Sequence, residues 1–190
     1  MNLGGYFVSF MSGNSTRLGI ALGQNDRAQI VQAIGLILMF LFGVIFSSLL
    51  ANAAKENRTT VVLSFVATLL GLAALSFQLG HLYLAGTCQV MAMGALNLVF
   101  ARDGNVSLGL TYMTGSLVKA GKQIARAILG ESRWEFAPYL WLWAGLVGGA
   151  ALGASLSRVG APVLLLAGAI FTALLIPLAN RHIGAPTTED

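Results

Sequence analysis

The sequence predicts an all-α, polytopic integral membrane protein, and three observations lead to that fold class. First, 56% of the 190 residues are hydrophobic and only 9% are charged, whereas soluble domains carry about a quarter charged residues. Second, the hydrophobic residues form long runs without charge. Third, at about 20 residues per crossing the length allows about six or seven membrane segments and leaves no room for a soluble domain. We therefore expect a single transmembrane helical bundle.

Five runs are long enough to cross a bilayer and contain no charged residue. They cover residues 28–54, 59–79, 82–101, 136–157 and 159–180. Charged or turn-forming residues separate them, for example residues 55–58 and 102–105. We expect one spanning helix in each run.

Two further segments, residues 3–23 and 106–129, are apolar but interrupted. The first contains the polar run of residues 13–17, and the second contains Lys119, Lys122 and Arg126. These three basic residues follow the spacing i, i+3 and i+7, so they share one face of a helix. The second half of that segment is therefore amphipathic, and it suits a membrane interface or basic side chains that snorkel to the headgroups.

The two interrupted segments match each other at an ungapped offset of 102 residues, which indicates an internal duplication. Residues 10–14 (FMSGN) align with residues 112–116 (YMTGS), and Arg17 aligns with Lys119. The same offset aligns a stripe of small residues in each copy, a pattern typical of helix packing. The aligned pairs are Gly43 with Gly145, Ser47 with Gly149, and Ala51 with Gly153. We predict repeat one at residues 1–80, repeat two at residues 81–182, and a polar tail at residues 183–190.

The offset also leaves one segment without a partner. Residues 82–101 precede the second motif, and their counterpart would lie before Met1. Repeat one would then be without its first helix. We expect an uncovered, lipid-exposed groove beside Gly4, Met11 and Leu18.

The distribution of basic residues favours an inverted arrangement of the two copies. If both interrupted segments cross the membrane, four of the basic residues between spans lie on each side of the membrane, which gives no preferred orientation. If both enter and return as broken or re-entrant elements, the division is six against two, which is an ordinary positive-inside bias. Three spans then separate the two copies, so they enter from opposite faces as an inverted-topology repeat.

Catalytic patterns are absent from the sequence. All seven acidic residues lie outside the hydrophobic runs, so no intramembrane carboxylate is available as a proton or sodium relay. There is no HExxH, GxSxG or Walker A motif, and Cys88 is the single cysteine. The scattered Lys and Arg form no basic patch for nucleic acid. We expect no enzyme activity, catalytic residue, metal or cofactor, and no nucleic-acid partner.

The aligned motifs nevertheless suggest a binding site. Ser12 and Thr114 are good N-cap residues, so we predict that a half-helix begins at each and presents the next backbone N–H groups to a ligand. A helix N-terminus attracts anions, and Arg17 and Lys119 follow one turn later. The candidate substrate-binding residues are Ser12, Gly13, Asn14, Ser15 and Arg17 in the first copy, and Thr114, Gly115, Ser116 and Lys119 in the second. Alternatively, these residues serve only helix packing, and the two charges reach toward headgroups.

Residues 7–19 (FVSFMSGNSTRLG) and 111–119 (TYMTGSLVK) resemble the bacterial YoaK-like membrane family, known as domain of unknown function 1275. The resemblance extends over nearly the whole chain. It implies this order of segments and a multi-pass location in the inner (plasma) membrane, but no substrate, because the activity of the family is not established. Family members usually carry one more hydrophobic segment upstream, typically with an acidic residue in it.

Two functional hypotheses from different classes remain. The first is a secondary transporter or channel for a small solute, anionic if the two half-helix starts bind it. The alternative is a non-transporting membrane scaffold or regulatory protein. Both place the chain in contact with the lipid bilayer, and both leave homo-oligomers open.

Overall fold

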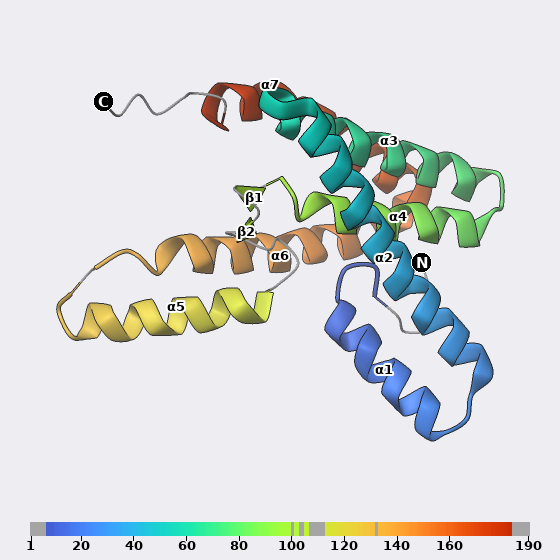
Figure 1. Cartoon of the computed structure of the whole chain (residues 1–190), viewed down its shortest axis with the longest axis horizontal. Coiled ribbons are helices and arrows are strands. Elements are labelled where there is room, and N and C mark those ends of the chain that lie inside the picture. The colour runs from blue at the N-terminus through green and yellow to red at the C-terminus, as the bar shows by residue number, and fades with distance from the viewer. Residues whose placement is uncertain (1–6, 100, 103–104, 107–112, 132, 184–190) are drawn as a thin grey trace. The chain divides into compact units, whose positions relative to one another are not determined.

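The helices of the computed structural model follow the hydrophobic runs of the sequence (Figure 1). The structure describes residues 7–99, 101–102, 105–106, 113–131 and 133–183. The α-helices are α1 (Met11–Gly23), α2 (Arg27–Ala54), α3 (Arg58–Gln78), α4 (Leu82–Leu96), α5 (Met113–Ile128), α6 (Ala137–Ser155) and α7 (Ala161–Ile183). Short 3-10 helices follow α2 and α6, at η1 (Lys55–Asn57) and η2 (Leu156–Val159). The two-residue strands β1 (Ala101–Arg102) and β2 (Asn105–Val106) pair antiparallel.

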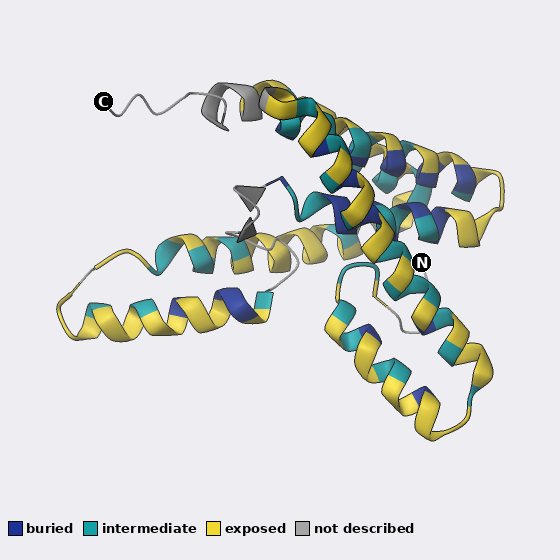
Figure 2. Ribbon diagram, viewed as in Figure 1, coloured by how far each residue is buried: buried dark blue, intermediate teal, exposed yellow. Residues whose placement is uncertain are grey.

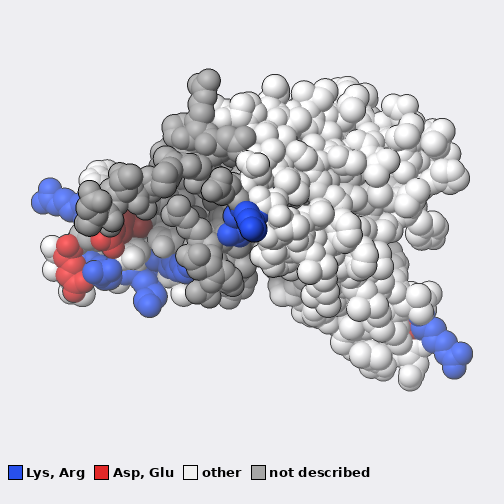
Figure 3. Space-filling model, turned by 45° about the horizontal axis from the view of Figure 1, so that its top comes forward, with Lys and Arg blue, Asp and Glu red and all other residues white. Residues whose placement is uncertain are grey.

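Four of the described helices, α2, α3, α6 and α7, are long and apolar enough to cross a membrane. Their side chains are apolar on almost every side, as expected for helices that face lipid. On the face drawn in Figure 3, a large part of the described surface carries no charged side chain. The chain is therefore a polytopic helical membrane protein, as the sequence predicts.

Helix α4 is shorter than the predicted span over residues 82–101, because it ends at Leu96 after 15 residues. The side-chain amide of Asn97 donates a hydrogen bond to the carbonyl of Met93 at 2.9 Å, the carbonyl that the backbone N–H of Asn97 would take in a continued helix. The backbone N–H groups of residues 97–99 instead donate to carbonyls three residues back. One polar side chain thus ends a run that the sequence suggests is a full span.

The described residues form two compact units, one within Met1–Val99 and Ala161–Asp190, the other within Phe100–Gly160. In the first unit, α3 packs against α7 and α4, and α4 also packs against α2. Buried residues gather on α3 and α4 (Figure 2). The central cluster contains Val66, Leu69, Leu70 and Ala73 of α3, Cys88, Ala92 and Ala95 of α4, and Ala169 of α7. That residues 1–190 form a single transmembrane domain stays a prediction.

Helices α2 and α4 cross with their backbones in direct contact. A Cβ atom added at Gly43 of α2 would overlap the backbone of Met91, and one added at Gly94 of α4 would overlap the carbonyl oxygen of Phe40. Further along α2, Ser47 is fully buried and Ala51 is 6% exposed. The stripe of small residues in the first copy therefore packs against a neighbouring helix.

The second unit is a hairpin of α5 and α6. Gly115, Ser116 and Ala120 are the buried residues of α5. At the turn between the helices, the guanidinium of Arg126 pairs with Glu131 at 2.8 Å and with Glu135 at 3.3 Å. All three side chains are about half exposed, so this network contributes little to stability.

The order and bounds of the helices follow the 102-residue offset. Helices α1 and α5 begin at Met11 and Met113, a 3-10 helix follows both α2 and α6, and α3 and α7 begin within one residue of the same offset. Helix α6 is the exception, because it begins several residues later than the start of α2 implies. Among the described residues 7–80, no helix corresponds to α4 at this offset.

Candidate functional site

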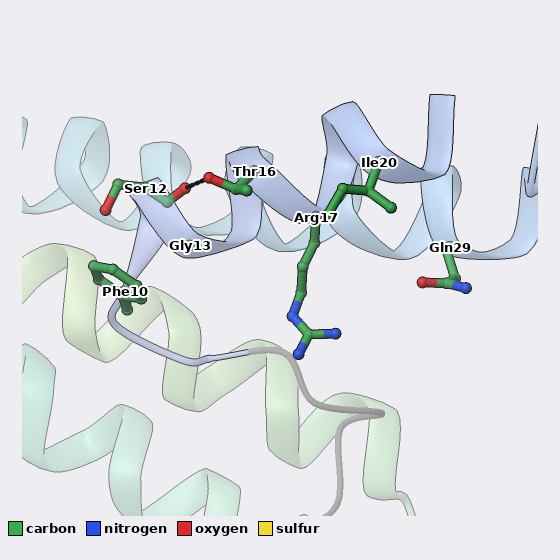
Figure 4. Close-up of a pocket in the computed structure, with 7 residues that line it drawn as sticks. All are labelled: Phe10, Ser12, Gly13, Thr16, Arg17, Ile20 and Gln29. Carbon is green, nitrogen blue, oxygen red and sulfur yellow. Dashed lines mark hydrogen bonds between the residues drawn. The ribbon is translucent and has the colours of Figure 1, made fainter. Parts of the chain in front are cut away.

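An open hollow of about 480 Å³ lies beside the start of α1 (Figure 4). It is lined by Phe10, Ser12, Gly13, Thr16, Arg17, Ile20 and Gln29. All of these except Gln29, which comes from α2, belong to α1 or directly precede it. The hollow therefore lies on the first of the two motifs that the sequence singles out.

Helix α1 begins earlier than predicted. Its first residue is Met11, with Phe10 at the capping position, and no side chain caps its N-terminus. The prediction that Ser12 is the N-cap is therefore wrong, because Ser12 lies in the first turn. The backbone N–H of Asn14 donates to the carbonyl of Phe10 at 3.1 Å. The backbone N–H groups of residues 11–13, in the first turn of α1, have no acceptor within the helix. Of the backbone N–H groups that we expected to face a ligand in this motif, only that of Gly13 is among them.

Asn14 orders the chain before α1. Its side-chain oxygen accepts the backbone N–H of Phe7 at 3.0 Å, and its side-chain nitrogen donates to the carbonyl of Phe7 at 2.7 Å. The side chain is fully buried, so these bonds satisfy groups that would otherwise lose their water partners. Asn14 thereby ties the segment around Phe7 back onto the first turn of α1.

The hydroxyl groups of this motif also bond within the helix. Ser15 donates to the carbonyl of Met11 at 2.9 Å, and Thr16 donates to the carbonyl of Ser12 at 3.1 Å (Figure 4). Of the five predicted site residues in the first copy, the hollow brings together Ser12, Gly13 and Arg17. Asn14 and Ser15 are not among its lining residues.

Gly13 is required for the position of the Phe10 ring. A Cβ atom at Gly13 would overlap that ring, which also contacts Phe7 edge-on with ring centres 5.5 Å apart. The ring of Phe10 lines the hollow at the start of α1 (Figure 4).

The sequence prediction missed several lining residues. Ser12, Thr16 and Ile20 follow a four-residue spacing and so share one face of α1, a signal that could have added the last two. Gln29 carries no such signal, because it reaches the hollow only through the turn between α1 and α2. Asp26 caps α2 in that turn and accepts hydrogen bonds from both the backbone N–H and the side-chain amide of Gln29, at 3.1 and 2.7 Å. These bonds hold the pKa of Asp26 below its usual value and fix the Gln29 side chain.

The second motif lies on α5. This helix begins at Met113, so Thr114 is inside its first turn and the prediction that it is the N-cap is wrong. Gly115 and Ser116 are buried, and the ammonium of Lys119 lies 5.8 Å from the centre of the Tyr139 ring of α6. That distance allows a cation–π interaction. The two motifs belong to different units, and a solute site shared between them stays a prediction.

In the part of the chain that the structure describes, no three His, Cys, Asp or Glu residues lie together in a way that could hold a metal ion. The polar groups at the hollow are hydroxyl, amide and guanidinium groups. Such a set suits recognition of an anion or a hydrogen-bond acceptor more than covalent chemistry.

Comparison with known proteins gives two matches. A family described as "Protein of unknown function (DUF1275)" matches residues 1–177. The chain is also 34% identical over 181 residues to the UPF0700 transmembrane protein RA0705 of Rhizobium meliloti (strain 1021), a match that covers 93% of this chain and 78% of the relative. No solved structure matches.

Proposed function

We propose, since the chain belongs to the DUF1275 family of membrane proteins, that it is an inner-membrane secondary transporter or channel for a small anionic solute. The observation that carries this proposal is the hollow beside the start of α1, which is lined both by Arg17 and by the first-turn residues Ser12 and Gly13. A guanidinium group offers paired donors that match a carboxylate or phosphate. The positive end of the helix dipole adds to the same attraction.

The lengths of α1 and α5 support the proposal. They contain 13 and 16 residues, which at about 1.5 Å per residue gives about 20 and 24 Å. The hydrocarbon core of a bilayer is about 30 Å thick. A helix of either length that starts at one membrane face ends within the bilayer, as expected for the broken segments that bind solutes in transporters.

The duplication also supports it. The starts of α1 and α5, and of α3 and α7, are related by nearly the same offset as the sequence motifs. In addition, α3 packs against α7, its partner in the alignment. A two-fold axis that relates two copies of a repeat brings equivalent helices of the two copies together at the axis. We infer two inverted copies, each with one cationic motif: Ser12–Arg17 in the first and Thr114–Lys119 in the second.

Neutralisation of the motif charges tests the proposal. Arg17→Gln should weaken binding about ten- to a hundredfold, the loss of one charge-assisted contact of about 1.5–3 kcal/mol. Lys119→Gln should also weaken binding, because it removes the cationic group of the second motif. The measurement is uptake of chloride, acetate and inorganic phosphate by vesicles that contain the purified protein.

Two control variants make this test specific. Arg158→Gln removes a charge in η2, outside both motifs, and should leave uptake unchanged. Tyr139→Leu removes the ring beside Lys119 but keeps the charge, so it separates the loss of the charge from the loss of the ring contact. Uptake that is equally fast without both motif charges would contradict the proposed site.

A non-transporting scaffold is the second candidate. The bonds of Asn14 and Ser15 favour it, because two of the predicted binding residues serve the local backbone. Vesicles that show no uptake of the three anions, with Arg17→Gln and the original chain binding them equally weakly, would favour this alternative.

A further inference from the structure

Helix α5 has a basic side and an apolar side. Its basic residues share one side of the helix: Lys119, Lys122 and Arg126. Exposed apolar residues lie on roughly the opposite side: Leu117, Ile124 and Ile128. A helix of this kind suits the boundary between lipid tails and lipid headgroups.

The level of α5 in the membrane follows from its contact with α6. The two helices run antiparallel (Figure 1), and the ammonium of Lys119 lies 5.8 Å from the centre of the Tyr139 ring. Tyr139 is the third residue of α6, whose 19 residues give about 28 Å, close to the thickness of the hydrocarbon core. Lys119 therefore lies near one face of that core. The rest of α5, up to Ile128, continues about 14 Å further, toward the headgroups.

The part of the hairpin beyond this level combines basic and apolar side chains. We define the hairpin tip by six of its residues: Lys122, Arg126, Ile128, Leu129, Arg133 and Trp134. Neither α5 nor α6 covers the three apolar ones, since Ile128 is 80% exposed, Leu129 76% and Trp134 74%. Tryptophan beside Lys and Arg is typical of the membrane–water interface.

The chain offers few carboxylates that could neutralise the tip. Of its seven acidic residues, Glu131 and Glu135 already pair with Arg126, and Asp26 caps α2. None of the ion pairs in the described part of the chain involves Lys122 or Arg133. An anion from outside the chain suits these two cations best.

We propose that the hairpin tip binds the headgroups of anionic phospholipids, with Lys122 and Arg133 bonded to the lipid phosphate and Trp134 at the boundary with the tails. The guanidinium of Arg133 offers paired donors that match a phosphate. Attraction to an anionic membrane surface raises affinity about fivefold for each Lys or Arg near it. Phosphatidylcholine is a weaker partner, because its headgroup carries its own cation. The inference goes beyond the proposed transport of a solute and does not depend on it.

Fluorescence of the tip itself tests the proposal. The three tryptophans of the chain are Trp134, Trp141 and Trp143, so a Trp141→Phe, Trp143→Phe background leaves Trp134 as the single reporter. The full chain is placed in phosphatidylcholine vesicles that contain a small, equal fraction of brominated phosphatidylglycerol or brominated phosphatidylcholine. We expect brominated phosphatidylglycerol to quench Trp134 more strongly. Lys122→Gln and Arg133→Gln should each lower its association about fivefold, and the double variant should abolish the preference.

Two further variants make the test specific. Arg158→Gln removes one charge from η2 at the opposite end of α6, about 28 Å along the helix, and should leave the preference unchanged. Glu131→Gln with Glu135→Gln releases Arg126 from its two ion pairs. This variant should bind phosphatidylglycerol more strongly than the original chain, a gain that a misfolded protein would not show.

Four results would overturn the proposal. The first is equal quenching by the two brominated lipids, and the second is a preference that survives in the Lys122→Gln, Arg133→Gln double variant. The third is no quenching by either lipid, which would show that another part of the chain covers the tip. The fourth is quenching that inorganic phosphate relieves at constant ionic strength, which would make the ligand a free anion. None of these readouts measures anion uptake, so failure here is distinct from failure of the proposed function.

Discussion

Two glycines on α2 should respond in opposite ways to replacement by alanine. A Cβ at Gly43 would meet the carbonyl oxygen, Cα and carbonyl carbon of Met91, and these backbone atoms cannot rotate away. At Gly35 on the same helix, no described atom beyond its own chain neighbours and the adjacent backbone of α2 lies within 4 Å of the added Cβ. The same chemical change is thus made once in a backbone contact and once in open space.

The magnitudes follow from two effects. Alanine favours a helix over glycine by about 1 kcal/mol, and overpacking a close contact costs about 1–3 kcal/mol. We expect Gly35→Ala to be neutral or stabilising by up to about 1 kcal/mol. Gly43→Ala should be less stable than Gly35→Ala by about 1–3 kcal/mol, because of the two only Gly43→Ala places a Cβ atom in an already close contact. Gly94→Ala should match Gly43→Ala, since its Cβ would overlap the Phe40 carbonyl oxygen.

Thermal unfolding in detergent, followed by circular dichroism, measures these differences. The double variant Gly43→Ala with Gly94→Ala should cost less than the sum of the two single variants, because both force apart the same crossing. If Gly43→Ala proves as stable as Gly35→Ala, the backbones of α2 and α4 are not in contact.

Three further outcomes are expected. Asn14→Leu should destabilise the start of α1 by about 1–3 kcal/mol, because it leaves backbone groups of Phe7 unpaired, and hydrogen exchange of residues 7–14 should accelerate while that of α3 does not. The pKa of Asp26 is held below the usual 3.8 by its bonds to Gln29, so its capping contribution is present above that pH and is lost as the pH falls through the lowered value. The amide signal of Gln29 should report this loss in a pH titration, and Asp26→Asn, which keeps the cap, should remove the pH dependence. Cysteines placed just before and just after each motif segment should label from the same side of the membrane, and labelling from opposite sides would disprove the inverted arrangement.

The bounds of most helices could be predicted from the sequence, because charged and turn-forming residues separate the apolar runs. The predicted span 28–54 and the observed Arg27–Ala54 differ by one residue, and the span 59–79 is observed as Arg58–Gln78. The early end of α4 could not be predicted in this way. It depends on one uncharged polar residue, Asn97, whose side chain competes with the helical backbone.

The candidate site was harder to predict in detail. A hollow lies on the motif that the sequence singles out, and binding of a solute there stays a prediction. The start of α1 differs from the prediction, and before it Asn14 bonds the backbone seven residues earlier. Capping rules consider only the side chain at the cap and the first turn after it. Gln29 joins the hollow through the fold of the turn before α2, which no local pattern encodes.

The unequal lengths of two packed helices affect the membrane around the protein. Helix α2 contains 28 residues and α4 contains 15, which gives about 42 and 22 Å. Neither matches a hydrocarbon layer of about 30 Å, so α2 must tilt or extend into the headgroups while lipid beside α4 becomes thinner. Because the two helices pack backbone to backbone at Gly43 and Gly94, one cannot change its tilt without the other. We therefore expect the stability of the protein to pass through a maximum as the acyl chains of the host lipid are lengthened.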